Sequence, residues 1–370
     1  TGAPVPLGAL FVNGAGDEDI HWARTAALFA QADWELAPGL TLSLGGRASW
    51  DRKRIFTQFF DPALPPTAPY DITQGVLPRA LTSQGGARAT WFQFTPKVIL
   101  NWRVNDEALV YASFARGYNA GGFSARAGTV ADTTTPFDPE FINAYEVGGK
   151  FDLLNGRLRI NAAAFYNDYK DKQEEAIEPG PPPTFTSTTV RNVAAARIWG
   201  LEFEASALLS DWLRLDGSLG ILDAKYTDYT AFVGAGQFVS VPPQPAGTLL
   251  LADLAALKLR RTPKVTASIS PTADFDLGAA RLTLNGIARF TDRQTTEFFN
   301  SQRGFIPATW TFDASAAVGF GGPRQDRFRV SLFGRNLSDQ QRISSFTNSL
   351  VDFSTVSVGR TWGLEFLVNY

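Results

Sequence analysis

The sequence contains no cysteine, no methionine and a single histidine, His21, among its 370 residues. The lack of cysteine excludes a disulfide framework and thiol chemistry. One histidine without cysteine also excludes Cys/His catalysis and most zinc sites. No HExxH or GxSxG motif is present, and the acidic pair Glu174-Glu175 is by itself a weak signal for a glycosidase. We therefore expect no enzyme activity, no cofactor and no protein-bound metal.

The chain also lacks an excess of charge and a long apolar run. Lys and Arg total 34 against 36 Asp and Glu, a net charge of -2, so nothing in the composition points to nucleic acid. No apolar run reaches the roughly 18 residues of a transmembrane helix. The most apolar stretch, residues 248–260, is broken by Asp253, and we expect a loop or a short amphipathic turn there.

The first residues, TGAPVP, contain no Met and no signal-peptide pattern. We therefore expect the chain to be a fragment, or the mature part of a longer protein. The whole of residues 1–370 is predicted to be one domain.

The most informative pattern is an alternation of apolar and polar residues. In LTLSLGGRASWD, which begins at Leu40, every second residue is apolar, small or aromatic. The last segment, 360–370, repeats the pattern with one apolar face made of Trp362, Leu364, Phe366, Val368 and Tyr370. A period of two is typical of β-strands with two unlike faces. We expect about thirteen strands, at residues 24–37, 40–54, 89–104, 107–119, 139–154, 157–171, 189–209, 212–227, 263–276, 280–294, 307–320, 327–339 and 352–370.

The connections between these strands alternate in length. Short turn signals such as Pro38-Gly39 and Asn155-Gly156 alternate with long loops rich in Gly, Pro, Ser and Thr, for example residues 55–88 and 171–188. Tight turns at one end and long loops at the other are typical of an outer-membrane β-barrel. An odd strand number leaves a sheet unclosed, which is not tolerated in lipid, so we expect complementary strands to be missing.

The two faces also favour a membrane protein. Bulky charged residues recur on the polar face, which suits a water-filled lumen, and tryptophans lie near the strand ends of the apolar face, which suits two interfacial girdles. Two alternatives remain at this point. One is a passive porin-type channel, and the other is a soluble β-rich binding protein.

Several segments resemble the TonB-dependent outer-membrane receptor family. FTPKVILNWRVNDEALVYASFARGYNAGGF, from Phe94, resembles the family's YASxxxGFxxGGF region. PEFINAYEVGGKFDLLNGRLRINAAAFYNDYKD, from Pro139, resembles its YEVGxK and NGRLxLNxAxFYxxY hairpin. ARIWGLEFEA and FRVSLFGRNLSDQQ resemble further family segments in the same order. The resemblance runs from about Ala26 to the final Tyr370, where the family's C-terminal signal more often has Phe.

The resemblance implies an all-β fold, the C-terminal part of a transmembrane, antiparallel, up-and-down barrel of about 22 strands, with the plug domain absent from this chain. It implies a multi-pass protein of the Gram-negative outer membrane that actively takes up a bulky, scarce ligand, commonly a ferric siderophore. The implied partners are the TonB energy-transducing complex, acting through the missing plug, the iron-siderophore or similar ligand, and the barrel assembly machinery.

The resemblance also assigns candidate residues. The expected lumen wall, which either seats the plug or pairs its own charges, includes Glu146, Lys150, Arg159, Glu202 and Glu204. The expected ligand-binding loops include Phe59, Phe60, Tyr70, Arg116, Tyr118, Asn119, Phe123, Phe298, Phe299 and Arg303, although loop packing is the alternative for each aromatic residue. The expected assembly signal is the apolar face of the last strand. Basic residues near the upper strand ends are candidates to meet outer-membrane lipid and lipopolysaccharide phosphates, with solvated loop positions as the favoured alternative: Lys53, Arg54, Lys170, Lys172 and Arg293.

Overall fold

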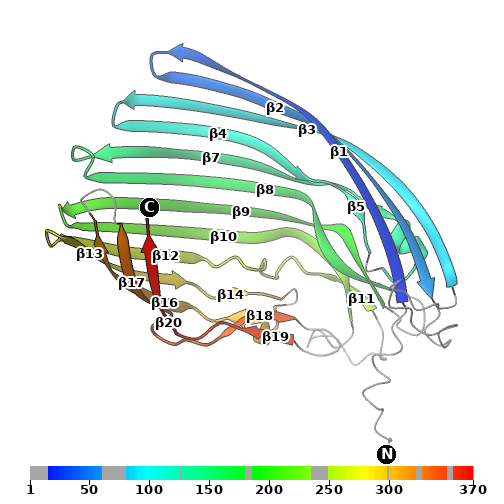
Figure 1. Ribbon diagram of the computed structural model, residues 1–370. Helices are drawn as coiled ribbons and strands as arrows, with labels where there is room; N and C mark the ends of the chain where they lie inside the picture. Colours follow the sequence, from blue (N-terminus) through cyan, green and yellow to red (C-terminus); the bar gives the residue numbers. More distant parts are fainter. Residues whose placement is uncertain are drawn as a thin grey trace, which may run out of the picture.

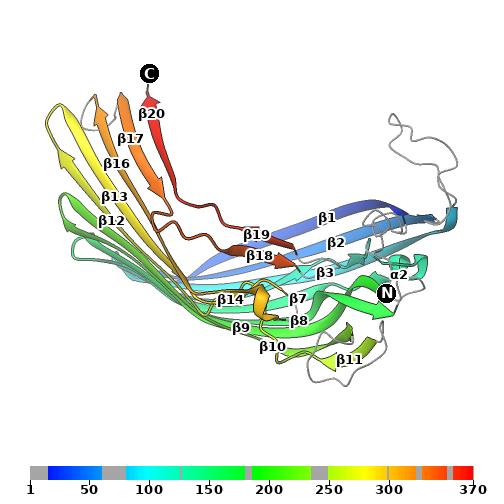
Figure 2. The same ribbon diagram turned by 90° about the horizontal axis from the view of Figure 1, so that it is seen from below.

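The structure, a computed structural model, describes residues 16–60, 81–125, 127–179, 186–234, 249–297, 300–321, 327–347 and 353–369. Its main element is one antiparallel sheet bent into an open trough (Figures 1 and 2). The sheet follows the order β1-β2-β3-β4-β7-β8-β9-β10-β12-β13-β16-β17-β20. The predicted all-β antiparallel fold is therefore confirmed.

The long strands are β1 (Gly16–Ala37), β2 (Leu40–Phe60), β3 (Leu81–Asn105), β4 (Ala108–Asn119), β7 (Glu140–Leu153), β8 (Leu158–Pro179), β9 (Thr186–Ser210), β10 (Leu213–Gly234), β12 (Val265–Asp276), β13 (Ala280–Thr291), β16 (Thr309–Phe320), β17 (Phe328–Arg335) and β20 (Thr361–Val368). The short elements are β5 (Gly122–Phe123), α2 (Val130–Thr134), β6 (Pro136–Phe137), β11 (Leu249–Asp253), β14 (Gln294–Thr295), η1 (Gln302–Gly304), β15 (Phe305–Ile306), β18 (Ile343–Thr347) and β19 (Phe353–Val356).

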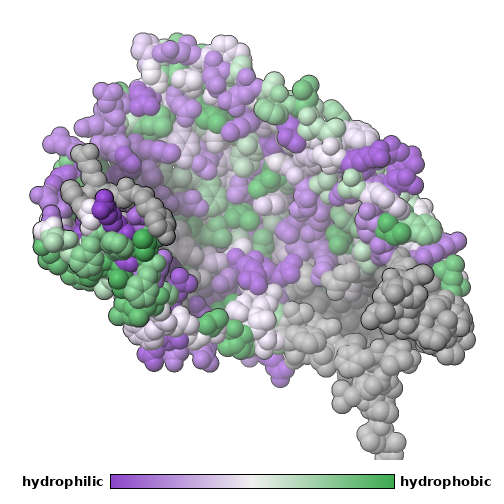
Figure 3. Space-filling view, in the orientation of Figure 1, coloured by the Kyte–Doolittle hydropathy of each residue, from purple (hydrophilic) through white to green (hydrophobic). Residues whose placement is uncertain are grey.

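The strand register sorts the residues onto two continuous faces. One row crosses the sheet from β1 to β12 with apolar residues only, through Trp34, Leu42, Leu100, Ala112, Val147, Ala164, Leu201, Ile221 and Val265. The next row on the opposite face contains Glu35, Thr41, Asn101, Tyr111, Gly148, Ala163 and Glu202. An apolar outer face and a polar inner face are typical of a transmembrane barrel wall. Figure 3 looks into the trough, where hydrophilic residues line much of the hollow.

Several strands are longer than predicted, and the last two are shorter. β2 continues to Phe60 rather than 54, and β3 begins at Leu81 rather than 89. β3 and β9 each contain 25 residues, more than twice the about 9–11 residues that cross a membrane. The excess lies at the long-loop end, so parts of the expected loops are paired strands. β17 ends at Arg335 and β20 begins at Thr361, because the β18–β19 hairpin lies between them.

Tight turns join the strands at the other end of the trough. In the β1–β2 turn Gly39 has a φ of +76°, and a Cβ there would lie 2.5 Å from the carbonyl oxygen of Arg103. Arg103 N donates a hydrogen bond of 2.7 Å to Gly39 O, so this turn is held against β3. Glycine is required here by both the left-handed backbone and the close approach.

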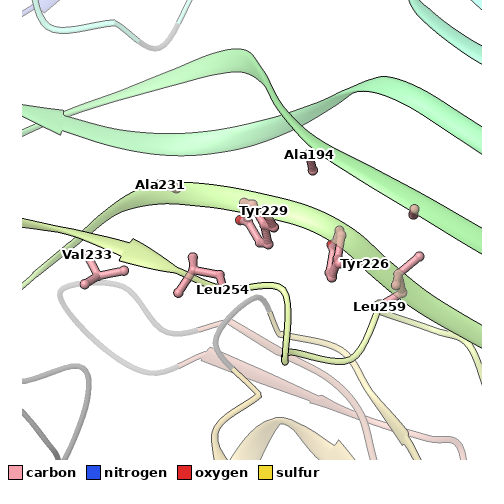
Figure 4. Packing of buried hydrophobic residues seen from close by; sticks show 8 residues of the cluster. Ala194, Tyr226, Tyr229, Ala231, Val233, Leu254 and Leu259 are labelled. Carbon is pink, nitrogen blue, oxygen red and sulfur yellow. The ribbon is translucent and has the colours of Figure 1, made fainter.

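Short elements cover the inner face at the long-loop end. Most inner-face residues in the second half of β2, including Asp51, Ile55 and Phe59, are buried, and α2 and β5 contact this strand. A second buried cluster joins β9 and β10 to residues 254–259 and contains Ala194, Ala196, Tyr226, Tyr229, Ala231, Val233, Leu254 and Leu259 (Figure 4). The stretch 248–260, expected to be a loop or turn, therefore contributes β11, paired with β10, and two buried leucines. Among the described residues, no helix has the length and apolar character needed to cross a membrane.

Candidate functional site

Several polar and charged residues of the inner face contact one another. Tyr111 Oη donates a hydrogen bond of 2.6 Å to Glu146 Oε1. Asn161 Nδ2 donates to Glu204 Oε2 at 3.3 Å, and Arg159 Nε lies 2.6 Å from Asp152 Oδ1. Of the predicted wall residues, Glu146, Arg159 and Glu204 are thus engaged within the wall itself. This pairing satisfies charges that face a lumen.

The polar face predicted from the sequence includes Arg289, Arg329 and Arg335, but their gathering around one cavity was not predicted. A cavity of about 450 Å³ lies against β13, β16, β17 and β20, and Arg289, Asp313, Arg329, Arg335 and Glu365 are among its lining residues. Arg289 Nη1 lies 2.6 Å from Asp313 Oδ2, and Asp313 Oδ1 accepts a 2.8 Å hydrogen bond from the Asn336 backbone. The polar positions of the alternation contained the signal, but the cross-strand register was needed to bring these residues together.

The predicted ligand-binding residues of the β4–β7 region lie at the long-loop end of the trough. Arg116 stacks over the Phe141 ring, 4.4 Å from its centroid. Tyr118 Oη donates a 2.5 Å hydrogen bond to Asp51 Oδ2. Asn119 Nδ2 donates to Gln173 Oε1 at 3.1 Å. These contacts tie β4 to β2 and β8.

Two of the aromatic residues predicted to bind the ligand are buried by packing in this structure. Phe59 is 7% exposed and Phe123 is 8% exposed, so neither side chain presents a flat ring at the surface. Arg303 lies in η1. Phe60 is the last residue of β2. Tyr70, Phe298, Phe299 and Tyr370 lie outside the described residues.

A buried ionic cluster near this end was missed by sequence reasoning. Glu174, whose side chain is 3% exposed, lies 2.6 Å from Lys172 Nζ and 3.5 Å from Arg260 Nη2. Tyr226 Oη donates a further 2.8 Å hydrogen bond to the same carboxylate. Burial and the nearby Glu174 charge raise the pKa of Tyr226, and the same causes raise the pKa of Tyr229 to about 12. Glu174 was noted in the sequence only as part of an acidic pair.

A neighbouring cluster places two cations on one aromatic ring. Arg293 Cζ lies 4.1 Å and Lys258 Nζ 5.5 Å from the centroid of Phe305. Asn300 Oδ1 accepts a 2.6 Å hydrogen bond from the Lys258 backbone. The backbone N–H of Phe346 donates at 3.1 Å to Thr296 Oγ1. Segments before β12, between β13 and β16, and between β17 and β20 therefore interlock over this end of the trough.

The predicted apolar face of the last strand, β20, is exposed in the structure. Trp362, Leu364 and Phe366 are 62%, 64% and 71% exposed, respectively. Across the strand pair Trp362 lies opposite Gly334, and Leu364 lies opposite Leu332 of β17. Val368 ends the described strand, opposite Phe328.

The structure divides the basic residues expected to meet lipid phosphates. Lys172 is bound to Glu174, Arg293 stacks on Phe305, and Lys53 Nζ lies against Gly122 of β5. Lys170 is exposed and lies 3.6 Å from Asp168. Arg54 is exposed and stacks on Trp22, 5.3 Å from the ring centroid.

No metal-ligand group was found within the described ranges. There, no three or more Asp, Glu or His side chains are arranged to hold a metal ion. Cations, aromatic rings and hydrogen-bonding side chains gather at the long-loop end.

Comparison with known proteins agrees with this architecture. The family description "TonB dependent receptor-like, beta-barrel" matches residues 12–337. The metal-pseudopaline receptor CntO of Pseudomonas aeruginosa is 29% identical over 172 residues, which are 46% of this chain and 22% of CntO. The probable TonB-dependent siderophore receptor PiuA of Acinetobacter baumannii is 24% identical over 163 residues, 40% of this chain and 21% of PiuA.

Solved structures share the fold. The ferric yersiniabactin uptake receptor FyuA of Yersinia pestis superposes with a TM-score of 0.72 at 17% identity, covering 96% of this chain and 47% of FyuA. The siderophore receptor PiuA of A. baumannii gives a TM-score of 0.63 at 18% identity, covering 94% of this chain and 43% of PiuA. The chain thus spans less than half of these receptors.

Proposed function

Since the chain belongs to the TonB-dependent receptor family of β-barrels, we propose that it forms part of the wall of an active transporter for a bulky metal chelate, in the first instance a ferric siderophore. Membership of this family implies the outer membrane of a Gram-negative bacterium. The strands would cross this membrane many times. The relatives named above are receptors for metal-pseudopaline and siderophores, which supports a metal chelate as the ligand.

The observation that carries the proposal is the separation of the two faces of the wall. The apolar row from Trp34 to Val265 faces one side, and Glu146, Glu202 and Glu204 lie on the other. A soluble binding protein would bury the apolar face, whereas a barrel wall exposes it to lipid. A polar lumen suits the seating of a plug, which would couple the transporter to the TonB complex.

Capture of the chelate is assigned to the long-loop end of the trough. Lys258 and Arg293 around Phe305 provide positive charge beside an aromatic ring, and Arg116 provides a third cation on Phe141. Cations attract an anionic chelate, and aromatic rings give flat contact to its organic part. Tyr118 and Asn119 would hold this region in shape through Asp51 and Gln173. The exposed apolar face of β20 would be read by the barrel assembly machinery.

The test is uptake of a radiolabelled ferric siderophore by cells that produce the full-length receptor. We expect uptake above that of the receptor-deficient parent, and loss of this uptake when TonB is deleted. A panel of chelates with different charge would then identify the ligand. TonB-independent passage of small solutes into liposomes that contain the full-length protein would instead establish the passive porin-type channel.

A further inference from the structure

The strand β3 has a long edge that no described strand covers. On one side β3 pairs with β2 in an unbroken register that continues as far as Phe59 and Ser83. On the other side it pairs with β4 only up to Lys97, and β3 runs on beyond the end of β4 at the long-loop end of the trough (Figure 1). Among the described strands, residues 84–96 are therefore paired on one side alone. No other backbone hydrogen bond joins them to a further described segment.

A proline marks the point at which the pairing with β4 ends. Arg103 N donates a hydrogen bond to Gly39 O on the side of β2, and residues of an antiparallel strand alternate between its two edges. The odd-numbered residues of β3 therefore bond to β2, and the even-numbered residues direct their N–H and C=O groups to the side of β4. Pro96 is even-numbered and has no N–H, so it interrupts the ladder just beyond the pair formed by Val98 and Phe114. The free edge begins at this proline.

The free edge extends out of the apolar part of the wall. On the outer face Phe92 is 66% exposed, and the next outward side chains along the strand, Thr90 and Arg88, are polar and exposed. Unpaired backbone groups are not tolerated in lipid, so this polar part of the edge belongs in water. The inner face of the same stretch is covered, because Trp91 Nε1 donates a 3.4 Å hydrogen bond to Asp138 of the segment before β7. The edge is thus accessible to a strand that approaches from the side of β4.

This edge has little of the usual protection against pairing with another chain. Natural edge strands are commonly protected by several charges, a proline or a bulge. Between residues 84 and 95, β3 has no proline, and Arg88 is its single charged residue. The register with β2 contains no bulge over this stretch. The aromatic residues Trp91, Phe92 and Phe94 add a high strand propensity. The stretch is therefore suited to receive an added strand.

The charge beside the edge selects the kind of strand that fits. Arg88 lies opposite Arg54 of β2. The adjacent row contains Arg24, Arg52 and Thr90. Like charges that lie opposite one another destabilise a sheet, and an acidic residue opposite Arg88 on an added strand would offset this repulsion. A second copy of β3 would instead bring a further arginine and no acidic residue, so the charge disfavours pairing of the chain with itself.

We propose that the free edge of β3 binds an extended, acidic segment of a second protein by strand addition at the long-loop end. Every second residue from Gln84 to Phe94 would pair its backbone groups with the added strand, and acidic side chains on the outer face of that strand would meet Arg88. Main-chain pairing supplies the affinity, and the charge supplies the preference for an acidic segment. The site lies beside the wall and outside the lumen, so it is independent of the transported ligand.

The test uses the full-length receptor in a non-ionic detergent and a fluorescein-labelled peptide of about ten residues that alternates Glu with Val. Binding is measured by fluorescence anisotropy. We expect the Glu peptide to bind, and the same peptide with Lys in place of Glu to bind at least about tenfold more weakly. N-methylation of the alternate amides that face β3 should abolish binding, whereas N-methylation of the other alternate set should preserve it. This peptide series needs no variant of the receptor to fold.

Substitutions in β3 test the site itself, with heat-dependent gel mobility as the check that each variant is folded. Thr90→Pro removes an N–H that points to the free edge and leaves the bonds to β2 in place, so we expect it to weaken peptide binding by at least about tenfold. Arg88→Glu should weaken binding of the Glu peptide by about five- to tenfold and strengthen binding of the Lys peptide. Arg103→Glu, on the same strand at the tight-turn end, is the matched control and should change neither affinity.

The proposal is overturned by absence of binding of the Glu peptide. Binding that survives N-methylation of both sets of amides would also overturn it, because such binding would be a contact between charges without strand pairing. Equal affinity of the wild type and Thr90→Pro would do the same. Dimerisation of the receptor that Thr90→Pro abolishes, without binding of the peptide, would assign the edge to a second copy of this chain instead.

Discussion

Tyr226 and Glu174 lie 52 positions apart in the sequence, and the phenol of Tyr226 donates a 2.8 Å hydrogen bond to Glu174 Oε1. Lys172 on the same strand and Arg260 from the segment before β12 face the same carboxylate. One buried charge thus connects β8, β10 and residues 254–264. The arrangement holds residues 254–264 against the inner face at the long-loop end of the trough, which we call its mouth.

Replacing Glu174 with glutamine should release this segment. The substitution leaves Lys172 partly buried without its ionic partner, and loss of one member of a buried pair costs about 3–5 kcal/mol. We expect faster amide hydrogen exchange of residues 254–264 in the full-length receptor, measured by mass spectrometry. Asp228→Asn, at an exposed position of β10, should leave the exchange unchanged. Equal exchange in the two variants would contradict a clamping role for Glu174.

The same cluster predicts a loss of stability in alkaline solution. The pKa of Tyr229 rises from 10.0 to about 12, first because of burial and then because of Glu174, and that of Tyr226 rises as well. The unfolded chain loses the phenolic proton near pH 10 while the folded chain keeps it. This contribution to stability is therefore complete below about pH 10 and is lost as the pH rises towards about 12.

Thermal unfolding of the full-length receptor across this pH range measures the effect. Tyr229→Phe should make the decline in unfolding temperature less steep, because one of the two protonated phenols is gone. Tyr166→Phe, on the outer face, is the control and should keep the wild-type slope. The same slope for Tyr229→Phe and wild type would refute the assignment.

A glycine in the wall sets the position of Tyr111. A Cβ on Gly148 would lie 2.6 Å from the Tyr111 hydroxyl and 2.8 Å from the carbonyl oxygen of Ala162. Gly148→Ala should therefore displace the ring from Glu146 and cost about 1–3 kcal/mol through overpacking. The same change at Gly286, where the nearest atom is 3.7 Å away, should be tolerated. Heat-dependent gel mobility of the full-length barrel compares the two, and equal stability would rule out the steric argument.

The cations around Phe305 predict a charge-dependent affinity. Arg293→Gln together with Lys258→Gln should weaken binding of an anionic ferric chelate to the full-length receptor by about tenfold, since each close charge contributes on the order of 1 kcal/mol or less in exposed sites. A neutral chelate should be affected much less. Arg157→Gln with Arg214→Gln, at the tight-turn end, removes the same charge and should change neither affinity. Isothermal titration distinguishes these outcomes, and equal losses for both double variants would contradict the proposed capture site.

The alternation of residues was enough to predict the strands, because each face has one environment over most of the wall. Leu42, Leu100 and Val147 lie in one row of the apolar face. The recurrence of apolar residues at every second position of each strand indicates such a face directly. The strand ends were less predictable. β8 runs on to Pro179 with shifts in register near Lys172, and such extensions depend on pairing with β9 rather than on the local sequence.

The mouth of the trough was harder to predict for the same reason. Phe59 and Phe123 are aromatic residues that the sequence places in expected ligand-binding loops, but in the structure their side chains are buried. Two of the partners of Glu174 are Tyr226 and Arg260, which are distant from it in the chain. Arg24 and Arg88 become neighbours of Arg52 and Arg54 only through the register. Long-range contacts of this kind leave no periodic signal.

The order of strands has a consequence for how the wall assembles. Along the path from β1 to β20, each long strand pairs with the next long strand of the chain. Every described strand of this path other than β1 and β20 therefore has a neighbour on both sides. Hairpins can therefore add one after another, and each addition closes only a short length of chain, which keeps the entropic cost of every step small. The edge of β20 at the end of the described path stands outside this sequence of local steps. A closed barrel requires β20 to pair with a strand that is distant in the sequence, so we expect that pairing to determine the rate at which the wall becomes a closed surface.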